Sequence, residues 1–222
     1  MKNKNIIAVQ NLLRCLSLES LKNLEVVTNL VRAFGIMYWP SASGPEVAFI
    51  QQQGAGLAQT PSQIAKTLVY LSRFRINSFC EIGVYFGGNF LFCSEYLRRF
   101  NPDIHCTGID PGNYLDSEIR AIIEQETWLN FKSCTSDEIA GMGFDLIFLD
   151  GDHTTPWITR DWVNVGQIAK ICAFHDLQEP TCPDVGMFWA TLQNEKKVKV
   201  EFLDDPSGQN IHGIGIIHER KL

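Results

Sequence analysis

Short apolar runs alternate with amphipathic segments along most of the chain. The apolar runs have the length of buried strands, and the amphipathic segments repeat their apolar residues every three or four positions, as helices do. The predicted strands cover residues 75–83, 104–109, 129–133, 144–150, 171–176, 198–203 and 213–218, and the predicted helices cover residues 60–74, 89–100, 117–126, 156–168 and 184–193. This order predicts an α/β fold, a Rossmann-like doubly wound sheet of about seven strands that is mostly parallel, with helices on both faces. The last two strands are separated only by a turn-rich segment, so we expect a hairpin with one antiparallel C-terminal strand.

The residues before this pattern form a helical segment and a loop. Leu and Val recur at helical spacing between residues 8 and 34, and Gly35 suits the end of a helix. We expect this helix to be a packing element or the contact of a homo-oligomer. Residues 36–59 mix aromatic residues with Gly, Pro, Ser and Gln, and we expect a mobile loop that covers the active site as a lid. Thr60 to Gln63 then predicts a capping box at the start of the next helix.

Composition narrows the class of protein. A chain of 222 residues with 45% hydrophobic and 20% charged residues fits one compact domain, with a catalytic part at 60–222 behind the segment 1–59. A net charge of −6 argues against nucleic acid as a partner, and no apolar run is long enough to suggest a membrane span. The seven cysteines lack Cys-x-x-Cys spacing, so they are interpreted as reduced core residues of a cytoplasmic protein.

A Gly-rich turn at residues 81–88, EIGVYFGG, gives the strongest chemical signal. It joins a predicted buried strand to a helix, and Asp110 ends the next strand about 20 residues later, where such sheets place a carboxylate on ribose hydroxyls. Tyr85 occupies the position where a dinucleotide fingerprint needs its second glycine, and no Gly-Lys-Ser/Thr follows the turn. The expected ligand therefore carries ribose but little phosphate, and S-adenosylmethionine (SAM) fits that description.

Two more polar clusters follow predicted strands. Asp150, Asp152 and His153 end the segment FDLIFLDGDH, and His175 and Asp176 end ICAFHD. Because the carboxyl ends of parallel strands meet at one edge of a sheet, we expect these side chains to share a cleft with the Gly-rich turn.

The chain resembles the class I SAM-dependent methyltransferases, whose first motif is an acidic residue followed by Gly-x-x-x-Gly. EIGVYFGG, LDGDH and FHD also stand in the order found in the group with the cephalosporin hydroxylase-like proteins and the macrolide or sugar O-methyltransferases. The resemblance implies transfer of a methyl group from SAM to a hydroxyl group of a small-molecule acceptor or sugar. It covers roughly residues 60 to 220 by order of strands and motifs.

The resemblance also implies roles for individual residues. Asp150 and Asp176 match the positions that hold a divalent cation, Mg or Mn, in metal-dependent relatives, and His175 stands where some relatives carry an acidic residue. His153 or His175 would accept the proton of the hydroxyl group. The cofactor residues would be Glu81, Gly83, Gly87 and Gly88 at the methionine part, Asp110 at the ribose, Cys134, Thr135 and Ser136 at the adenine, and Asp150.

Other interpretations stay open. Asp150 also suits a helix cap, the two histidines also suit structural positions, and Asp161 is expected on a solvated face or behind a site residue. At the level of the whole protein, the alternatives are a SAM-binding module without transfer activity and an NAD-dependent oxidoreductase.

Overall fold

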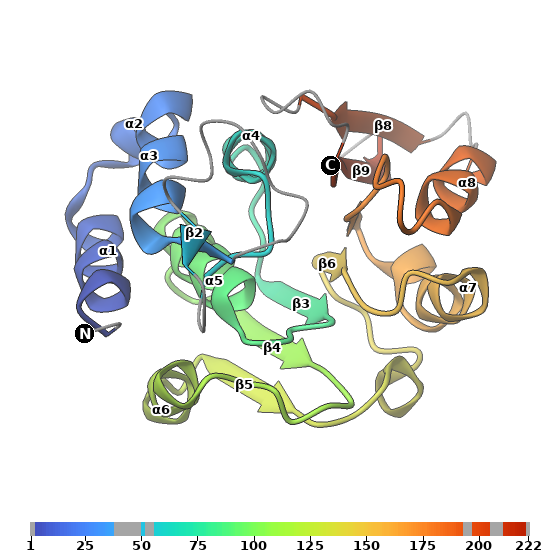
Figure 1. Cartoon of the computed structure of the whole chain (residues 1–222), viewed down its shortest axis with the longest axis horizontal. Helices are drawn as coiled ribbons and strands as arrows, with labels where there is room; N and C mark the ends of the chain where they lie inside the picture. The colour runs from blue at the N-terminus through green and yellow to red at the C-terminus, as the bar shows by residue number, and fades with distance from the viewer. Residues whose placement is uncertain (1–2, 38–49, 52–55, 193–196, 205–210, 221–222) are drawn as a thin grey trace.

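The computed structural model describes residues 3–37, 50–51, 56–192, 197–204 and 211–220. Its main sheet consists of β3 (Ser78–Ile82), β4 (His105–Ile109), β5 (Leu129–Lys132), β6 (Leu146–Leu149), β7 (Ile171–Phe174), β8 (Lys197–Phe202) and β9 (Ile214–Glu219). The seven strands lie in the order β5-β4-β3-β6-β7-β9-β8, and β9 is antiparallel to both of its neighbours while β3 to β7 are parallel (Figure 1). The predicted fold class is confirmed, including the antiparallel strand near the C-terminus.

The helices follow the predicted alternation. They are α1 (Asn3–Cys15), α2 (Leu18–Leu21), α3 (Leu24–Phe34), α4 (Pro61–Leu71), α5 (Gly88–Phe100), α6 (Ser117–Gln125), α7 (Thr155–Asn164) and α8 (Asp184–Thr191), with short 3-10 turns at Ser136–Ile139 and Gly166–Ile168. A two-stranded parallel pair, β1 (Ile36–Met37) and β2 (Ile50–Gln51), stands apart from the main sheet. None of the helices in the described ranges is long and apolar enough to cross a membrane.

The central strands are buried on both faces because alternate residues point into two different layers. Phe79 of β3 and Phe148 of β6 belong to a hydrophobic cluster shared with α1, α3, α4, α5 and α6. A second cluster, shared with α7 and α8, contains the residues next to these two in the strands, Cys80 of β3 and Ile147 of β6. Figure 1 shows α7 and α8 on the other side of the sheet from α4 and α5. Such two-sided burial explains the continuous apolar runs of the sequence.

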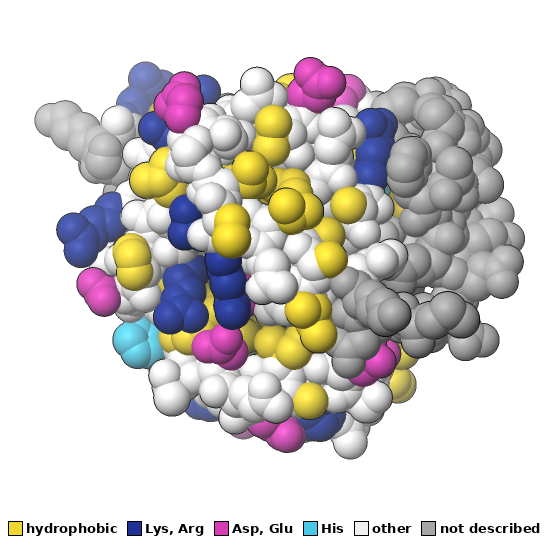
Figure 2. All heavy atoms as spheres, turned by 90° about the vertical axis from the view of Figure 1, so that its left-hand side faces the viewer, with side chains coloured by type: hydrophobic (Ala, Val, Ile, Leu, Met, Phe, Trp, Pro, Cys, Tyr) yellow, Lys and Arg dark blue, Asp and Glu magenta, His cyan; other side chains and the backbone are white. Residues whose placement is uncertain are grey.

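The N-terminal segment differs from the single helix predicted over residues 8–34. Ser17 and Asn23 adopt extended backbone conformations and cap α2 and α3, so the segment breaks into three helices. Their apolar sides are buried in the same hydrophobic cluster as Phe79 and Phe148. The Tyr96 hydroxyl of α5 donates a hydrogen bond of 2.6 Å to the carbonyl oxygen of Leu21. Figure 2 shows the outer side of this segment, where exposed hydrophobic side chains are interspersed with charged ones. An oligomer contact through these helices stays a prediction.

The expected capping box at α4 is wrong, although α4 begins at Pro61 as predicted. The side chain of Thr60 makes no cap hydrogen bond and instead lies 2.9 Å from Nδ1 of His212. Gln63 is fully buried, accepts a hydrogen bond from the backbone N–H of Gly213 and donates to the carbonyl oxygen of Ile211. Both polar residues therefore connect α4 to the segment before β9 and do not cap the helix. Of the predicted lid, residues 38–49 and 52–55 lie outside the described residues.

Candidate active site

A cavity of about 580 Å³ lies at the carboxyl ends of the parallel strands. The chain order reverses between β3 and β6, and open α/β sheets bind ligands at this kind of position. Among the described residues that line the cavity there is no Lys or Arg, whereas six carboxylates line it: Asp110, Asp150, Asp152, Asp161, Asp176 and Glu179. The cavity is therefore suited to a ligand that carries positive charge.

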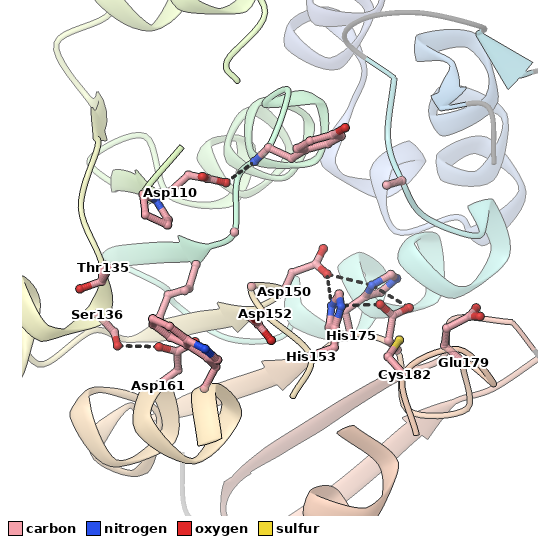
Figure 3. Close-up of a pocket in the computed structure, with 18 of the residues that line it drawn as sticks. Asp110, Thr135, Ser136, Asp150, Asp152, His153, Asp161, His175, Glu179 and Cys182 are labelled. Atoms are coloured by element: carbon pink, nitrogen blue, oxygen red, sulfur yellow. Dashed lines mark hydrogen bonds and ion pairs between the residues drawn. The ribbon is translucent and has the colours of Figure 1, made fainter. Parts of the chain in front are cut away.

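The turn after β3 needs a glycine at residue 83. The φ of Gly83 is 87°, and a Cβ atom there would lie 2.0 Å from the carbonyl oxygen of Asp150. Asp110, at the end of β4, accepts hydrogen bonds of 2.8 and 2.7 Å from the backbone N–H groups of Tyr85 and Gly112. These bonds fix the carboxylate of Asp110 at the cavity wall (Figure 3).

The structure brings most, but not all, of the residues predicted from the sequence to this cavity. The predicted residues that line the cavity are Gly83, Asp110, Cys134, Thr135, Ser136, Asp150, His153, His175 and Asp176. Glu81, Gly87 and Gly88 are not among the lining residues. A Cβ atom at Gly87 would meet the side chains of Leu115 and Ile119, so this glycine permits close packing of α6.

Glu81 is buried close to the cavity. Its side chain is 1% exposed and accepts a hydrogen bond of 3.1 Å from the amide of Asn89. Burial, and then the negative charge of Asp150, raise the pKa of Glu81 well above its usual value. Glu81 therefore does not line the cavity, but it lies next to residues that do.

Asp161 lies in the cavity wall on the side of Cys134–Ser136. It is 6% exposed, and its Oδ1 accepts a hydrogen bond of 2.5 Å from the hydroxyl of Ser136. Burial is the main cause of a raised pKa at Asp161. The expectation of a solvated face is therefore wrong for this residue. Trp157, also in the lining, stacks under the guanidinium group of Arg160 at 4.3 Å.

Asp150, His153, His175 and Asp176 form a compact group on the other side of the cavity (Figure 3). Nδ1 of His175 lies 2.9 Å from Oδ1 of Asp150 and 3.1 Å from Oδ1 of Asp176. Nε2 of His153 lies 3.5 Å from Oδ1 of Asp150 and 3.1 Å from Oδ2 of Asp176. Despite these short separations, neither ring nitrogen of His175 has a hydrogen-bond partner of suitable geometry among the described residues.

The group is a candidate site for a divalent cation. Ligand atoms that lie about 2.0–2.1 Å from one ion are roughly 3.0–3.4 Å apart from each other. The separations within the group run from 2.9 to 3.5 Å, close to this range, and its buried nitrogens lack hydrogen bonds of good geometry. Two imidazoles with two carboxylates favour manganese, iron or another borderline metal over magnesium.

Without a cation, protons compensate the charge of this group. Burial lowers the pKa of His175, but the charges of Asp150 and Asp176 outweigh burial and raise it well above its usual value. Conversely, burial raises the pKa of Asp150, but the charge of His175 and the interactions with the His153 and His175 side chains together outweigh burial, and the pKa lies below its usual value. The metal-free group therefore holds an imidazolium between carboxylates, and a cation that binds there must displace protons.

Sequence reasoning missed Glu179 and His212, which belong to a second group with Asp176. Burial, and then the charge of His175, lower the pKa of His212 to about 4, so its imidazole is neutral at physiological pH. A signal for His212 was present in the sequence, because it directly precedes an antiparallel strand. The first residues of such a strand lie at the same sheet edge as the ends of its parallel neighbours.

Residues with strained backbone conformations lie at the cavity. In the part of the chain that the structure describes, the non-glycine residues with positive φ are Tyr85 at 48°, Asp176 at 62° and His212 at 57°. All three line the cavity. Such conformations cost about 1–3 kcal/mol each and persist where the surrounding structure enforces them, often at functional sites.

Several solved structures with a similar fold are methyltransferases, and some of them contain SAM or SAH. An O-methyltransferase from Bacillus cereus in complex with SAH shares 11% identity, over 99% of this chain and 100% of that chain, with a TM-score of 0.58. The O-methyltransferase TomG from Streptomyces achromogenes, involved in tomaymycin synthesis and solved in complex with SAM, shares 12% identity over 73% and 81% of the chains, with a TM-score of 0.54. A putative caffeoyl-CoA O-methyltransferase from Staphylococcus aureus shares 13% identity over 74% and 86%, with a TM-score of 0.52.

At this level of identity the similarity establishes the fold. No family model matches the sequence, and comparison with curated proteins gives no match. The chain has the Rossmann-like fold of the class I SAM-dependent methyltransferases, with its cavity at the edge of the sheet where this fold class binds ligands.

Proposed function

We propose that this protein is a SAM-dependent methyltransferase that methylates a hydroxyl oxygen of a small molecule or sugar with the help of a divalent cation. One observation carries the proposal: a single acidic cavity contains both the carboxylate of Asp110 at the end of β4 and the group of Asp150, His153, His175 and Asp176 (Figure 3). The first feature suits a ribose and the second suits a cation.

The charge of the cavity favours SAM over a dinucleotide. SAM carries a cationic sulfur and an ammonium group, both of which the surrounding carboxylates would attract. The pyrophosphate of NAD would lie among carboxylates without a Lys or Arg partner in the described lining. Together with Tyr85 in place of the second glycine of the fingerprint, this makes the oxidoreductase the weaker alternative.

Different residues along the cavity would bind different parts of SAM. Gly83 lines the cavity where the methionine part of SAM would lie, and Asp110, already oriented by two backbone N–H groups, would accept hydrogen bonds from the ribose hydroxyls. Cys134–Ser136 and Asp161 border the space for the adenine. When bound, SAM supplies a methyl group on a cationic sulfur that an oxygen nucleophile can attack. Most of the rate would come from the positioning of the two reactants and the exclusion of water.

His153 is the better placed of the two histidines to accept the proton of the hydroxyl group. Its side chain is 32% exposed, whereas that of His175 is 3% exposed and held between Asp150 and Asp176. The proton would move to Nδ1 of His153, because Nε2 is buried and faces the carboxylates of Asp150 and Asp176, which would stabilise the imidazolium that forms. Burial alone lowers the pKa of His153, but Asp150 outweighs burial and raises it, which strengthens this base.

Asp150, His175 and Asp176 would hold the cation. A bound divalent cation lowers the pKa of a hydroxyl group that contacts it. His175 then acts as a ligand through Nδ1, the nitrogen that lies between the two carboxylates.

Calorimetric titration with S-adenosylhomocysteine (SAH) tests the cofactor. We expect micromolar binding by the wild-type protein and a loss of about tenfold to a hundredfold in affinity for Asp110→Ala, because charged hydrogen bonds contribute about 1.5–3 kcal/mol. Asp152→Asn is the matched control, since it changes another lining carboxylate that accepts a backbone hydrogen bond from Thr154. Equal SAH affinity of the wild type and Asp110→Ala would reject the assignment of Asp110.

A second experiment separates an enzyme from a binding module. The protein is incubated with radiolabelled SAM and a pool of hydroxylated small molecules, with manganese, with magnesium or with a chelator. Transfer of label supports the enzyme, and SAH binding without transfer to any acceptor supports the non-catalytic alternative. The cytoplasmic location stays a prediction.

A further inference from the structure

The two carboxylate oxygens of Asp150 have different surroundings. Oδ1 lies 2.9 Å from Nδ1 of His175 and 3.5 Å from Nε2 of His153, within the group that suits a cation. Oδ2 instead accepts a hydrogen bond of 3.0 Å from the side-chain amide of Gln59. Figure 3 shows Asp150 connected to the two histidines. The carboxylate of Asp150 is therefore also held by a residue from outside this group.

Gln59 comes from the segment before α4, and contacts on both sides of it hold its backbone in place. The backbone N–H of Leu57, which is fully buried, donates a hydrogen bond of 2.9 Å to the carbonyl oxygen of Gly35. On the other side, the hydroxyl of Thr60 lies 2.9 Å from Nδ1 of His212, and α4 begins at the next residue. A buried side chain on an anchored backbone can hold its partner in one orientation.

The amide of Gln59 is buried but only partly hydrogen-bonded. The residue is 2% exposed, and its Oε1 has no hydrogen-bond partner among the described residues. Burial of an amide oxygen without a partner is unfavourable, and an apolar side chain of similar length would avoid this cost. The position therefore favours a role of the amide at Asp150 over a role in stability alone.

The orientation of the amide follows from its partner. The reverse orientation would place Oε1 of Gln59 against Oδ2 of Asp150, and neither oxygen can donate a hydrogen bond. With Nε2 as the donor, Oδ2 is engaged and Oδ1 stays directed at the histidines. Carboxylates that bind metal ions are commonly held by such a hydrogen bond, which orients them toward the ion.

We infer that Gln59 is a positioning residue, whose amide holds Oδ2 of Asp150 so that Oδ1 faces the cation. The inference rests on the cation site of the proposed function, and it extends that site to the segment before α4. Ala58, the neighbour of Gln59, lines the cavity, so this segment reaches both the wall of the cavity and the cation ligands.

Calorimetric titration of the chelator-treated, purified protein with manganese chloride tests the inference. We expect Gln59→Met to bind Mn²⁺ about tenfold to a hundredfold more weakly than the wild type, which is the usual effect of losing such a partner. Methionine has a similar length and no donor. Gln10→Met is the matched control, because the buried amide of Gln10 donates a hydrogen bond of 2.8 Å to Glu95, and neither residue lines the cavity. This control should bind Mn²⁺ like the wild type.

Equal Mn²⁺ affinity of Gln59→Met and the wild type would overturn the inference. So would an equal loss in Gln59→Met and Gln10→Met, which would indicate general destabilisation. Melting temperatures measured with a chelator identify a variant that fails to fold. Gln59→Asn, which retracts the amide by one carbon, then replaces Gln59→Met and should show the same loss. If neither variant folds, Gln59 is a structural residue and the inference is rejected.

The wild-type titration separates this inference from the proposed function. A wild type that binds no Mn²⁺ would reject the cation site of the proposed function and the inference together. Mn²⁺ binding by the wild type with no effect of Gln59→Met would reject the inference alone. SAH titration of the same samples is read separately. Weaker Mn²⁺ binding by Gln59→Met, in a protein that does not bind SAH, would support the role of Gln59 and reject the methyltransferase.

Discussion

The carbonyl oxygen of Asp150 occupies the place where any residue other than glycine at position 83 would carry its Cβ atom, since the two would be 2.0 Å apart. The ends of β3 and β6 can approach each other this closely only because residue 83 lacks a side chain. Gly83→Ala should therefore push apart the two strand ends that form the centre of the cavity. We expect a lower melting temperature and loss of detectable SAH binding, measured by differential scanning fluorimetry and calorimetry.

Gly141→Ala serves as the control that separates the cost of a positive φ from the cost of the clash with Asp150. Gly141 also has a positive φ, 78°, but a Cβ atom there would meet nothing within 4 Å. Its substitution should cost only the backbone penalty of about 1–2 kcal/mol and leave SAH binding intact. If Gly83→Ala destabilised the protein no more than Gly141→Ala did, the close contact with Asp150 would have no energetic importance.

Gln63 is expected to stabilise the connection between α4 and the segment before β9. Gln63→Leu removes the acceptor of the backbone N–H of Gly213 and the donor to the carbonyl oxygen of Asp204. An unsatisfied buried polar group costs about 1–3 kcal/mol, so urea denaturation should show a loss of at least this size. Ser62→Ala is the control, because the buried hydroxyl of Ser62 has no hydrogen-bond partner among the described residues. Equal stability of the two variants would contradict this role of Gln63.

The same residue shows where sequence patterns mislead. Thr60 to Gln63 has the spacing of a capping box, but both side chains bond to residues about 150 positions later in the chain, Thr60 to His212 and Gln63 to Gly213. Local capping and long-range bonding need the same residue types, and only the tertiary fold decides between them. The sheet was predictable for the opposite reason. Its central strands are buried on both faces, so each is a nearly continuous apolar run.

The site was predictable as far as it depends on strand ends. Asp110, Asp150, His175 and Asp176 directly follow buried strands, and parallel pairing brings them together. For Asp161 only the alternative of a solvated face was wrong, because its helix, α7, passes over the cavity, which helical spacing alone does not reveal. Glu179 lies in a loop after β7, where no periodic pattern marks the side chains that turn inward.

Asp145 anchors the opposite edge of the sheet and should make stability depend on pH. Its Oδ2 accepts hydrogen bonds of 2.7 Å from the backbone N–H and the side-chain amide of Asn77, and its Oδ1 pairs with Lys170 at 2.6 Å. Burial raises the pKa of Asp145, but Lys170 and Asn77 outweigh burial, and the pKa in the folded state lies below 3.8.

Because the folded state lowers this pKa, the carboxylate stabilises the protein above pH 3.8, and the contribution is lost as pH falls through the folded value. Asp145→Asn should cost about 1–2 kcal/mol at pH 7, and the difference from wild type should shrink as pH falls below 4. Urea denaturation between pH 7 and pH 3 measures it. Lys170→Ala removes only an exposed partner and should cost less than about 1 kcal/mol. A constant difference across this pH range would exclude the carboxylate of Asp145 as its source.

Asp161 is expected to select adenine over other purines. Its carboxylate lines the cavity beside Cys134–Ser136 and accepts a hydrogen bond from Ser136, so it can also accept one from the exocyclic amino group of adenine. S-inosylhomocysteine carries a carbonyl oxygen at that position, which a carboxylate would repel. The wild-type protein should therefore bind SAH about tenfold to a hundredfold more tightly than the inosine analogue, a difference of about 1–3 kcal/mol.

Asp161→Asn should remove this preference, because an amide can donate to the carbonyl oxygen of the inosine analogue as readily as it accepts from adenine. Ser136→Ala keeps the carboxylate and should keep the preference. Competitive calorimetric titration with the two ligands gives both affinities for each protein. If the wild-type protein bound the two ligands equally, Asp161 would not face the base, and the hydrogen bond from Ser136 would be its whole role. A preference that survives in Asp161→Asn would instead point to backbone groups of Cys134–Ser136 as the selective contacts.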